Sequence, residues 1–524
     1  MTPEQLASTL QDFLTASSSS DAVVREDGGV VFDLAQSKYS VSGEHGKCLL
    51  HLWSAERNVV RRVLEAEVKN SVLRLAVQRL GQARPTKLEI CRERDRRTPS
   101  AKKAARSLHQ RKLQHALERS HPGFKISQLS TAMDLERSFG PIYSRGLLRK
   151  GNSAFAVLGV NQEETQSSID AALTFGILWL DRCREAQDGK AVVEGLKLFV
   201  PRGTSALTRE RMAHLNPIAA KWHLYEFDER GESVCEIDCA DRGNIATRLV
   251  HCPDDAAARD RFSQSISYVR TLISETEAVV LSPSEIAFRL HGLEFARARV
   301  AHDPRSLRTG QEIVFGLGAE ERVLEPCNEA DFIRLVQSIG EVRHPDGPRD
   351  HGLFRLHPER WLESLVVKNV SLLDERLDSS CQYSQVPAFS ARDRAMIDVL
   401  SATRTGRLAV IELKADEDIH LPLQGLDYWS RVEWHQVRGE FQRFGYFPGR
   451  ELSAESPLLF LVAPALHVHP ATDTILRYLS PTIDYTLVGI DERWRNNVKV
   501  IFRKRAATLK RGEVEPALAA LPGA

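Results

Sequence analysis

The pattern of apolar and polar residues predicts a β-hairpin near the C-terminal end of the chain. Residues 407–413, RLAVIEL, are almost continuously apolar, which is typical of a central strand covered on both faces. Residues 396–403 form a second strand-like run before it. Arg404-Thr405-Gly406 between them fits a three-residue turn in which glycine takes the left-handed position.

Three charged residues interrupt this hairpin where a buried strand should carry none. Glu412 and Lys414 are two residues apart at the end of the second strand, so their side chains share one face. Asp398 lies on the first strand. The midpoint of positions 398 and 412 is residue 405, inside the turn, so the hairpin register predicts that Asp398 and Glu412 face each other.

Facing carboxylates need a positive partner. Two carboxylates about 5 Å apart across a strand pair repel and would destabilise the sheet. A ligand set of oxygen atoms, with no cysteine or histidine on these strands, favours Mg²⁺ or Mn²⁺ over zinc. Lys414 is then available to steer an anionic substrate or to activate water.

The spacing of these residues resembles the signature of the PD-(D/E)XK nuclease superfamily. Asp398 stands for the acidic residue on the first strand, and Glu412-Leu413-Lys414 stands for the (D/E)xK element on the second. Isoleucine replaces the proline before the aspartate. Gln424 and Tyr428 are four residues apart, share a helical face, and resemble the QxxxY element of RecB-type members.

The resemblance covers about residues 350–505 and includes Glu363, in HPERWLESLV, on a preceding helix where many of these enzymes place another acidic group. It implies a restriction-endonuclease-like α/β core that hydrolyses phosphodiester bonds of nucleic acid, with DNA as the expected substrate, in DNA repair or defence. It also implies that Glu363, Asp398 and Glu412 hold the Mg²⁺ or Mn²⁺ ion.

The resemblance assigns further roles to three residues. Lys414 would orient or deprotonate the attacking water, Gln424 would position Lys414 or the phosphate, and Tyr428 would contact the nucleic-acid backbone or pack beneath it. The alternative is a non-catalytic nucleic-acid-binding or scaffold protein that retains a nuclease-like fold.

A second α/β domain is expected at residues 116–275, because its predicted elements follow the same order as those of residues 351–524. Each region reads helix, hairpin, long helix, strand, helix and two strands. The motif Phe227-Asp228-Glu229-Arg230 also parallels Ile490-Asp491-Glu492-Arg493. These parallels predict an internal duplication, and an unrelated α/β domain with the same element order is the alternative.

The predicted first copy lacks the charges of the second. If residues 156–161 align with residues 409–414, the counterparts of Asp398, Glu412 and Lys414 are Arg145, Gly159 and Asn161. The first copy is therefore expected to be catalytically silent and to serve domain packing or the binding of nucleic acid.

Residues 1–115 are expected to form a β-rich N-terminal domain that ends in a basic linker. Five strand-like segments between residues 29 and 92 predict a small barrel or sandwich. A basic cluster follows between Arg92 and Lys112. It could hold phosphates, or it could be the solvated face of a linker helix.

A helical connector is predicted for residues 276–350. The expectation rests on a stripe of apolar residues with roughly helical spacing: Ile286, Leu290, Leu293, Phe295 and Ala298.

The charge of the chain limits where nucleic acid could bind. A net charge of +1 over 524 residues excludes a uniformly basic surface, so phosphate contacts must come from local patches. The patch best placed for this lies in the same domain as the predicted hairpin. Its members are Arg493, Arg495, Lys499, Arg503, Lys504 and Arg505.

The composition also predicts the compartment. No apolar run reaches the length of a membrane span, and residues 1–20 lack the pattern of a signal peptide, so the cytoplasm is expected and a membrane partner is not. Eight cysteines are too sparse for a disulfide framework. Cys235 and Cys239 lack the paired spacing of a zinc site. A homo-oligomer is compatible with this organisation.

Overall fold

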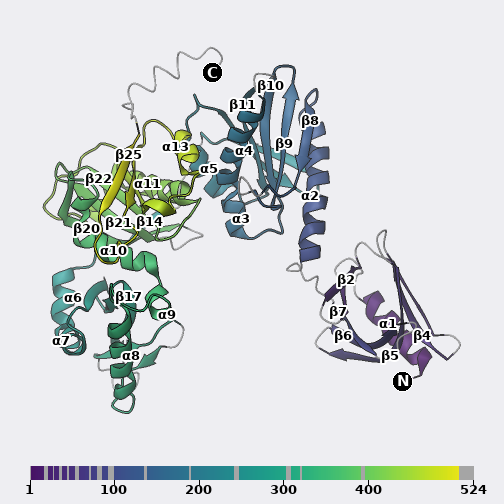
Figure 1. Ribbon diagram of the computed structural model, residues 1–524, viewed down its shortest axis with the longest axis horizontal. Coiled ribbons are helices and arrows are strands. Elements are labelled where there is room, and N and C mark those ends of the chain that lie inside the picture. The colour runs from purple at the N-terminus through teal and green to yellow at the C-terminus, as the bar shows by residue number, and fades with distance from the viewer. Residues whose placement is uncertain are drawn as a thin grey trace. The chain divides into compact units, whose positions relative to one another are not determined.

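Figure 1 shows the computed structural model of the chain, a mixed α/β protein. Two compact units make it up: residues 1–146, 159–169 and 227–234 form the first, and residues 147–158, 170–226 and 235–524 form the second. The structure describes residues 2–16, 22–26, 29–34, 38–43, 46–53, 58–69, 72–79, 85–91, 99–134, 139–187, 191–240, 247–302, 309–318, 321–390 and 396–506.

The N-terminal part of the first unit is an antiparallel sheet with one helix against it. Seven strands lie in the order β2-β1-β7-β6-β5-β4-β3. Cys48, Leu50 and Leu52 alternate with less buried residues and pack in one core with Leu10 and Phe13 of α1 (Pro3–Ala16). The strands are β1 Val23–Glu26, β2 Gly29–Asp33, β3 Lys38–Ser42, β4 Cys48–Trp53, β5 Asn58–Lys69, β6 Val72–Arg79 and β7 Thr86–Cys91.

The basic cluster predicted after this sheet falls partly on helix α2 (Pro99–Ser120). Two of its cations have partners within the first unit. Arg106 pairs with Glu164 at 2.6 Å, and Lys112 donates from Nζ to the main-chain oxygen of Glu229 at 2.6 Å. The arginines between residues 92 and 97 lie outside the described residues. These two side chains therefore hold local structure within the first unit, which neither the phosphate-binding alternative nor the solvated-face alternative predicted.

A mixed sheet forms the centre of residues 350–505, the C-terminal module, and takes one edge strand, β14, from outside this range. Its strand order is β14-β20-β21-β22-β23-β24-β25, and β22, β23 and β24 are parallel to one another. Every residue of β22 and β23 is buried, as expected of central strands. The strands are β14 Thr247–Leu249, β20 Leu377–Ser390, β21 Met396–Thr403, β22 Leu408–Leu413, β23 Leu458–Pro464, β24 Asp484–Ile490 and β25 Val500–Arg505.

The helices of the C-terminal module follow the order expected from the sequence. Its principal helices are α10 (Pro358–Lys368), α11 (Leu421–Val437) and α13 (Thr472–Arg477), preceded by the short α9 (Gly352–Arg355). A 3₁₀ turn, η2 (Val370–Leu372), and a short helix, α12 (Glu440–Arg443), complete the set with η3 (Ala465–His467). Helix α10 packs on β20, β21 and β22, whereas α11 packs on β22 and β23.

The middle of the chain has the same succession of elements. Its sheet has the order β13-β12-β11-β10-β9-β8. Its strands follow one another along the chain as β20 to β25 do: α4 lies between β10 and β11 as α11 lies between β22 and β23, and α5 lies between β11 and β12 as α13 lies between β23 and β24. This agrees with the predicted repeat, while common origin remains a hypothesis. The helix expected around Glu136 lies outside the described residues. The elements are β8 Lys125–Ser130, β9 Tyr143–Lys150, β10 Ser153–Val160, α3 Gln166–Asp170, α4 Ala172–Gln187, β11 Val192–Pro201, α5 Ala206–Met212, β12 Lys221–Asp228 and β13 Ser233–Ile237.

The prediction of a helical connector at residues 276–350 is wrong. An antiparallel sheet, β15-β16-β17-β18-β19, occupies most of this region, with α6, α7 and α8. Helices α6 and α7 precede residue 276, and residues of α7 share one core with the sheet, so this domain begins earlier than predicted. The elements are α6 Asp255–Arg261, α7 Ser263–Leu272, β15 Glu277–Ser282, β16 Glu285–Leu290, β17 Leu293–His302, β18 Thr309–Phe315, β19 Arg322–Val323 and α8 Glu329–Val342.

A two-residue turn explains the error. Leu290 pairs with Leu293, and His291 and Gly292 between them both have positive φ angles, 45° and 72°, as a tight hairpin requires. The apolar residues on either side of this turn alternate with a period of two, and the turn between them made that spacing look helical.

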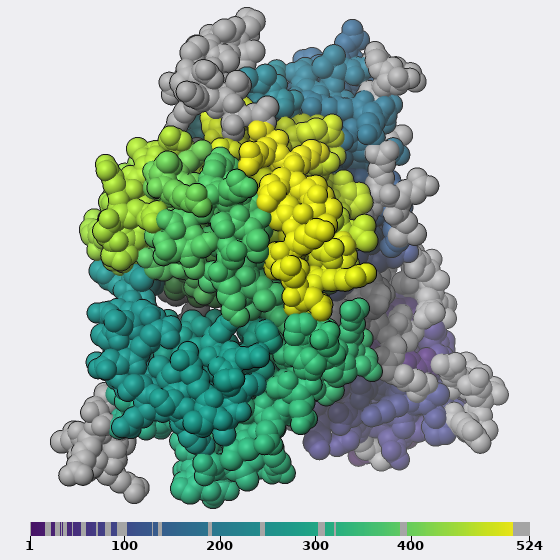
Figure 2. Space-filling model, turned by 60° about the vertical axis from the view of Figure 1, so that its left-hand side comes forward, coloured from purple at the N-terminus to yellow at the C-terminus, as the bar shows by residue number. Residues whose placement is uncertain are grey.

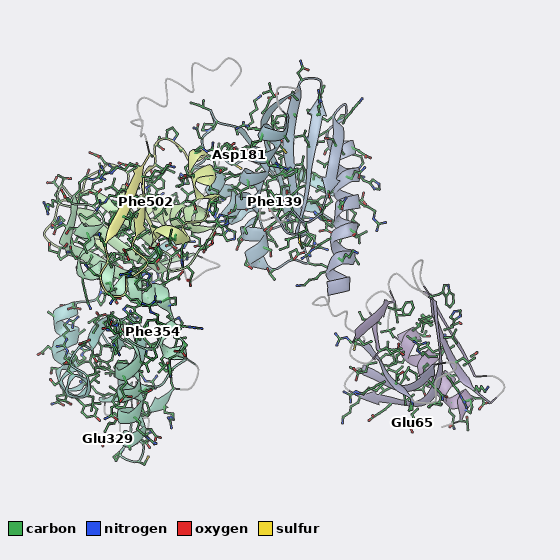
Figure 3. The ribbon with its side chains drawn as sticks, viewed as in Figure 1. Glu65, Phe139, Asp181, Glu329, Phe354 and Phe502 are labelled. Atoms are coloured by element: carbon green, nitrogen blue, oxygen red, sulfur yellow. The ribbon has the colours of Figure 1, made fainter. Side chains whose placement is uncertain are left out.

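Arg343 joins this five-stranded sheet to the C-terminal module. The side chain is fully buried and donates to the main-chain oxygens of Leu290, His291, Leu353 and Leu356 at distances of 2.7 to 3.1 Å. Burial lowers its pKa to about 10. Phe354 lies at the same junction (Figure 3) and packs against the ring of Trp361. One guanidinium thus satisfies the carbonyl groups of two loops and fixes them together.

No helix among the described residues is long and apolar enough to cross a membrane.

His291 at this junction predicts a dependence of stability on pH. Burial lowers its pKa from 6.5 to about 4, so between these values the unfolded chain binds more protons than the folded one. The contribution of neutral His291 to the free energy of unfolding is fully present above pH 6.5. It is lost as the pH falls toward 4, by up to about 1.4 kcal/mol per pH unit. His291→Asn, which tolerates the left-handed conformation, should remove this slope in urea unfolding measured from pH 7 to 4. Parallel stability curves for the two proteins would contradict the assignment.

Candidate active site

The hairpin of β21 and β22 has the register that the sequence predicts. Val399 pairs with Ile411 and Leu400 pairs with Val410, so one further step places Asp398 opposite Glu412. Gly406 in the turn has a φ angle of +82°. The amide of Leu413 donates to Oδ2 of Asp398 at 3.0 Å, across the strand pair. The aspartate therefore reaches the end of β22, where Glu412 and Lys414 lie.

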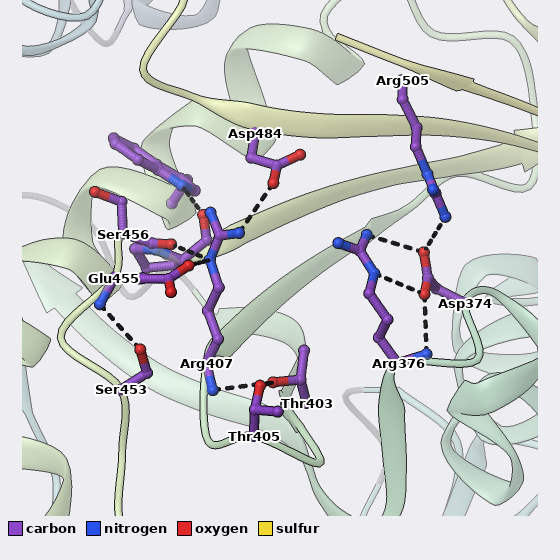
Figure 4. Close-up of polar contacts among 12 residues, drawn as sticks. Asp374, Arg376, Thr403, Thr405, Arg407, Ser453, Glu455, Ser456, Asp484 and Arg505 are labelled. Carbon is purple, nitrogen blue, oxygen red and sulfur yellow. Dashed lines mark hydrogen bonds and ion pairs between the residues drawn. The ribbon is translucent and has the colours of Figure 1, made fainter. Parts of the chain in front are cut away.

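Arg407, the residue directly after the turn of the hairpin, fixes β22 against its neighbours (Figure 4). It donates from Nη1 to Oδ2 of Asp484, the first residue of β24, at 3.0 Å, and from Nε to the main-chain oxygen of Ser456 at 2.7 Å. Its own amide donates to Oγ1 of Thr403 at 3.0 Å. These bonds set the position of β22 along its axis and therefore the position of Glu412.

The two carboxylates of the hairpin are held in a poorly solvated place. Glu412 is 2% exposed, and its Oε2 has no hydrogen-bond partner among the residues that the structure describes. Burial raises its pKa well above the ordinary value, and the charge of Asp398 raises it further. Burial also raises the pKa of Asp398, although the Leu413 amide opposes this. A cation placed between them would favour the charged form of both.

Lys414 supplies one positive charge to this site. Its Nζ lies 3.4 Å from Oε1 of Glu412, 3.6 Å from Oε1 of Glu359 and 3.9 Å from Oδ2 of Asp418. Burial alone would lower its pKa, but the carboxylates, Glu412 first, raise it above the ordinary value. The lysine is therefore a charged donor at neutral pH.

Two of these carboxylates, Glu359 and Asp418, were not predicted from the sequence, although a signal for Glu359 was present. Glu359 lies one helical turn before Glu363 on α10, and Asp418 lies four residues after Lys414. Burial raises the pKa of Glu359, and Lys414 opposes that shift. Spacing of one turn on a helix already known to carry an acidic candidate would have identified Glu359.

Helix α11 brings Gln424 and Tyr428 to the same place. A Cβ atom on Gly425 would lie 2.4 Å from Cδ2 of Leu461 and 3.6 Å from Cβ of Glu412, so glycine permits the close approach of the helix to β22 and β23. Oε1 of Gln424 is buried without a hydrogen-bond partner in the described part of the chain. Burial raises the pKa of Tyr428, and the charges of Glu412 and Asp398 add to that shift.

Glu363 is held by other side chains of the protein. Its Oε2 accepts from Nε2 of Gln385 at 2.5 Å and from Nη1 of Arg360 at 3.0 Å. Burial raises the pKa of Glu363 to about 8, Arg360 opposes this shift, and the charge of Asp398 adds to it. Glu363 therefore lies near the hairpin carboxylates with one oxygen already satisfied by hydrogen bonds.

Gln385 is a site residue that the sequence did not reveal. Gln385 belongs to β20. The pairing of Ser384 with Val399 and of Val386 with Ile397 places it opposite Asp398 of β21. It is 8% exposed, has a left-handed φ angle of 54°, and its Oε1 has no partner among the described residues. Strained conformations of this kind concentrate at functional sites. A backbone angle of one residue inside a strand leaves no local signal in the sequence.

The expected ligand set of Glu363, Asp398 and Glu412 is not assembled. Among the residues that the structure describes, no three His, Cys, Asp or Glu side chains form a group suited to a metal ion. Glu363 does not join the set because its Oε2 accepts hydrogen bonds from Gln385 and Arg360. The pair of Asp398 and Glu412 still fits Mg²⁺, because proteins usually hold this ion through one or two carboxylates while it keeps several waters. The unpartnered oxygen of Glu412 is the observation that supports the fit.

Half of the predicted phosphate-binding patch is occupied by contacts within the protein. Arg505 pairs with Asp374 at 2.7 Å (Figure 4), Lys504 pairs with Asp473 at 2.7 Å, and Arg503 donates to the main-chain oxygens of residues 372 and 373. Arg493 and Lys499 are exposed, and Arg495 stacks on Trp494 with 4.2 Å between its Cζ and the ring centroid. Of the patch, Arg495 alone lines a cavity beside the site.

Two cavities flank the first turn of α10, on which Glu359 lies. The larger, of about 950 Å³, is lined by Gln385 and Met396, and Figure 2 shows a hollow where the five-stranded sheet meets the C-terminal module. Its arginines are Arg259, Arg289, Arg297 and Arg360. The smaller, of about 380 Å³, is lined by Pro358 and by Ala415, which follows Lys414. Its arginines are Arg349, Arg355 and Arg495.

The aligned positions in the middle of the chain hold no such site. Arg145 is buried, donates to the main-chain oxygen of Ala132 and lies over the ring of Phe139. Asn161 is also buried, and its Oδ1 accepts from the amide of Glu163 at 2.8 Å. Gly159 contributes no functional group. The residues at these three positions therefore serve local structure.

Comparison of the chain with models of protein families, with curated proteins and with solved structures finds no match.

The turn that sets the register of the hairpin predicts a difference between two glycines. A Cβ atom on Gly406 would lie 2.1 Å from the main-chain oxygen of Glu451, in addition to the strain of its φ angle of +82°. Gly449 has a φ angle of +72° but has no atom within 4 Å of the same position. Gly406→Ala should therefore lower the free energy of unfolding by more than about 1 kcal/mol, and Gly449→Ala should cost less. Urea unfolding of both variants measures this, and equal losses would contradict the role of the close contact.

Proposed function

We propose that the protein is a metal-dependent nuclease that hydrolyses phosphodiester bonds of nucleic acid, with DNA as the expected substrate. The observation that carries this proposal is the buried pair of Asp398 and Glu412 beside Lys414, with Oε2 of Glu412 unpartnered. A purely structural pair of carboxylates would be expected to have all of its buried oxygens hydrogen-bonded.

Asp398 and Glu412 would hold Mg²⁺ or Mn²⁺ in this proposal. A bound divalent ion would lower the pKa of a water molecule and offset negative charge on the phosphate. Gln424 and Gln385 each present a buried amide oxygen without a partner, which would accept hydrogen bonds from water molecules around the ion.

Lys414 and Glu359 would have different roles, one toward the phosphate and one toward the attacking water. Lys414 keeps its proton, because its neighbouring carboxylates raise its pKa, so it serves as a donor to a phosphate oxygen and not as a base. Glu359, 3.6 Å away and with a pKa raised by burial, is placed to accept the proton of the attacking water. The water oxygen forms the new bond to phosphorus, and the leaving oxygen departs with the electrons of the old bond.

The two cavities favour a polyanionic substrate. Each contains arginines, and the carboxylates lie between them, at the first turn of α10 and the end of β22. The arginines of the larger cavity are already paired with carboxylates of the protein, so the smaller cavity, with Arg349, Arg355 and Arg495, is the stronger candidate for phosphate contacts. A nucleic-acid strand that follows both cavities would therefore pass the site with its phosphates close to guanidinium groups. This arrangement suits a chain whose net charge of +1 gives no general attraction for nucleic acid.

Substitutions in the hairpin test the proposal. Glu412→Gln and Lys414→Ala should each lower the rate of cleavage by at least about 100-fold, because the first removes a charge that would hold the metal ion and the second removes a charge that would act on the reacting phosphate. Asn161→Ala, at the aligned position in the middle of the chain, should leave the rate unchanged. The measurement is the cleavage of labelled single- and double-stranded DNA and RNA with Mg²⁺ or Mn²⁺.

Binding of the same nucleic acids, measured with Ca²⁺ in place of Mg²⁺, is the control. The hairpin variants should retain affinity, since the arginines of the smaller cavity would supply phosphate contacts that do not depend on the hairpin. Undiminished cleavage by Glu412→Gln would sink the proposal. Wild-type protein that binds nucleic acid but cuts none with any divalent ion would instead be the non-catalytic binder.

A further inference from the structure

Helices from the middle of the chain pack reciprocally with helices of the C-terminal module, all within the second unit. Helix α4 contacts α13, and α5 contacts α11. In the shared order of elements, α4 corresponds to α11 and α5 corresponds to α13. Each partner thus offers the same pair of helices to the other, which is the arrangement of a two-fold dimer interface.

A short antiparallel bridge joins the two segments that follow α5 and α13. Leu215, after α5, pairs with Leu479, after α13. The amide of Asn216 donates to the main-chain oxygen of Tyr478 at 2.8 Å, and the amide of Ser480 donates to that of His214 at 2.8 Å. The bonds are mutual, and each segment reads ring-bearing residue, leucine, polar residue and proline. The contact therefore repeats the two-fold relationship at the level of the backbone.

One contact of this interface has no counterpart on the other side. Arg211 of α5 is 6% exposed and donates from Nε and Nη2 to the two carboxylate oxygens of Asp427 on α11, at 2.8 and 2.7 Å. Its Nη1 donates to the main-chain oxygen of Asp170 at 2.5 Å. If Leu215 is aligned with Leu479, and residue 161 with residue 414, the equivalent residues are Ile475 and Thr174. Neither is charged, so the ion pair serves one helix only.

The helix that it serves is the one that carries Gln424 and Tyr428. Asp427 lies between them, next to Tyr428, and a bidentate pair fixes a carboxylate in both position and orientation. At the start of the helix, His420 Nδ1 lies 3.2 Å from Oγ1 of Thr174, which belongs to α4. Two points along α11 are thus attached to the middle of the chain, which restricts both the rotation and the sliding of the helix against β22.

We propose that Arg211 is a positioning residue: its ion pair with Asp427 holds Gln424 and Tyr428 in place against Glu412. The proposal rests on the proposed function for its catalytic consequence. It gives the middle of the chain a role that its own aligned positions lack, because it acts on the site from outside through α11.

The test compares Arg211→Gln with Arg477→Gln. Arg477 of α13 pairs with Asp181 of α4 at 3.4 Å, in the same interface but away from α11, and is 64% exposed; Asp181 is labelled in Figure 3. Arg211→Gln should lower kcat by about 100-fold, because the groups on α11 move relative to the phosphate, with little change in KM. Arg477→Gln should leave both constants unchanged. Arg211→Lys should retain part of the wild-type rate, since lysine keeps the positive charge but cannot donate two parallel hydrogen bonds to the carboxylate.

A second measurement does not depend on activity. Amide hydrogen exchange of residues 421–430 in the full chain should accelerate in Arg211→Gln and remain at the wild-type rate in Arg477→Gln. Asp427→Asn replaces Arg211→Gln if the latter fails to fold, and the double variant should be no worse than either single variant, because the two residues act as a pair.

The outcomes separate the two proposals. Unchanged exchange in α11, or an equal loss of kcat in both interface variants, overturns the role of Arg211. Faster exchange in α11 together with a wild-type protein that cuts no nucleic acid supports the anchoring of the helix and overturns the nuclease.

Discussion

Two carboxylates buried beside one ammonium group are the constraint on which the C-terminal module depends. Asp398 and Glu412 face each other across β21 and β22, and Lys414 reaches Glu412 from the same strand. Removing the ammonium group of Lys414 would leave the buried carboxylates without a compensating charge, which costs several kcal/mol in proteins generally. The surrounding structure meets this demand in steps: the Leu413 amide binds the aspartate, Gly425 brings α11 against the glutamate, and the first turn of α10 adds a further acidic group near the lysine.

The parts of this arrangement that sequence predicted are those fixed by local geometry. A period of two, a glycine at a left-handed turn position and the constant register of a hairpin together place residues 398 and 412 opposite each other without knowledge of the rest of the fold. The same rule applies at His291-Gly292. Because that turn was not recognised in the sequence, a helix was predicted where the structure has two paired strands. Both cases depend on recognising a turn, because the turn decides whether apolar residues on its two sides belong to one helix face or to two strands.

What the sequence did not predict depends on partners that are distant along the chain. Gln385 enters the site because β20 pairs with β21 over a register that brings it opposite Asp398, and Glu363 is engaged by that glutamine. The sequence shows the charge of a basic residue but not its partner. Arg505 was therefore expected to bind phosphate, whereas in the structure it pairs with Asp374. Charge is a local property, whereas the satisfaction of that charge belongs to the tertiary structure.

The asymmetry of the interface between the two α/β regions indicates why a silent copy would be kept. If the contact served packing alone, apolar and backbone contacts that obey the two-fold relationship would suffice, and α4 with α13 and α5 with α11 already supply them. Burying the guanidinium of Arg211 has a desolvation cost that a hydrophobic contact would avoid. Its two hydrogen bonds fix the orientation of the Asp427 carboxylate, which a hydrophobic contact would not do. That control falls on α11, which carries Gln424 and Tyr428, and not on α4, whose region holds Gly159 and Asn161 where charged groups would stand. The exposed pair of Arg477 and Asp181 on the other side of the interface gives no comparable control of α4. In the proposed nuclease, selection on the geometry of one site would explain why the buried, bidentate pair is present on a single side of a two-fold contact.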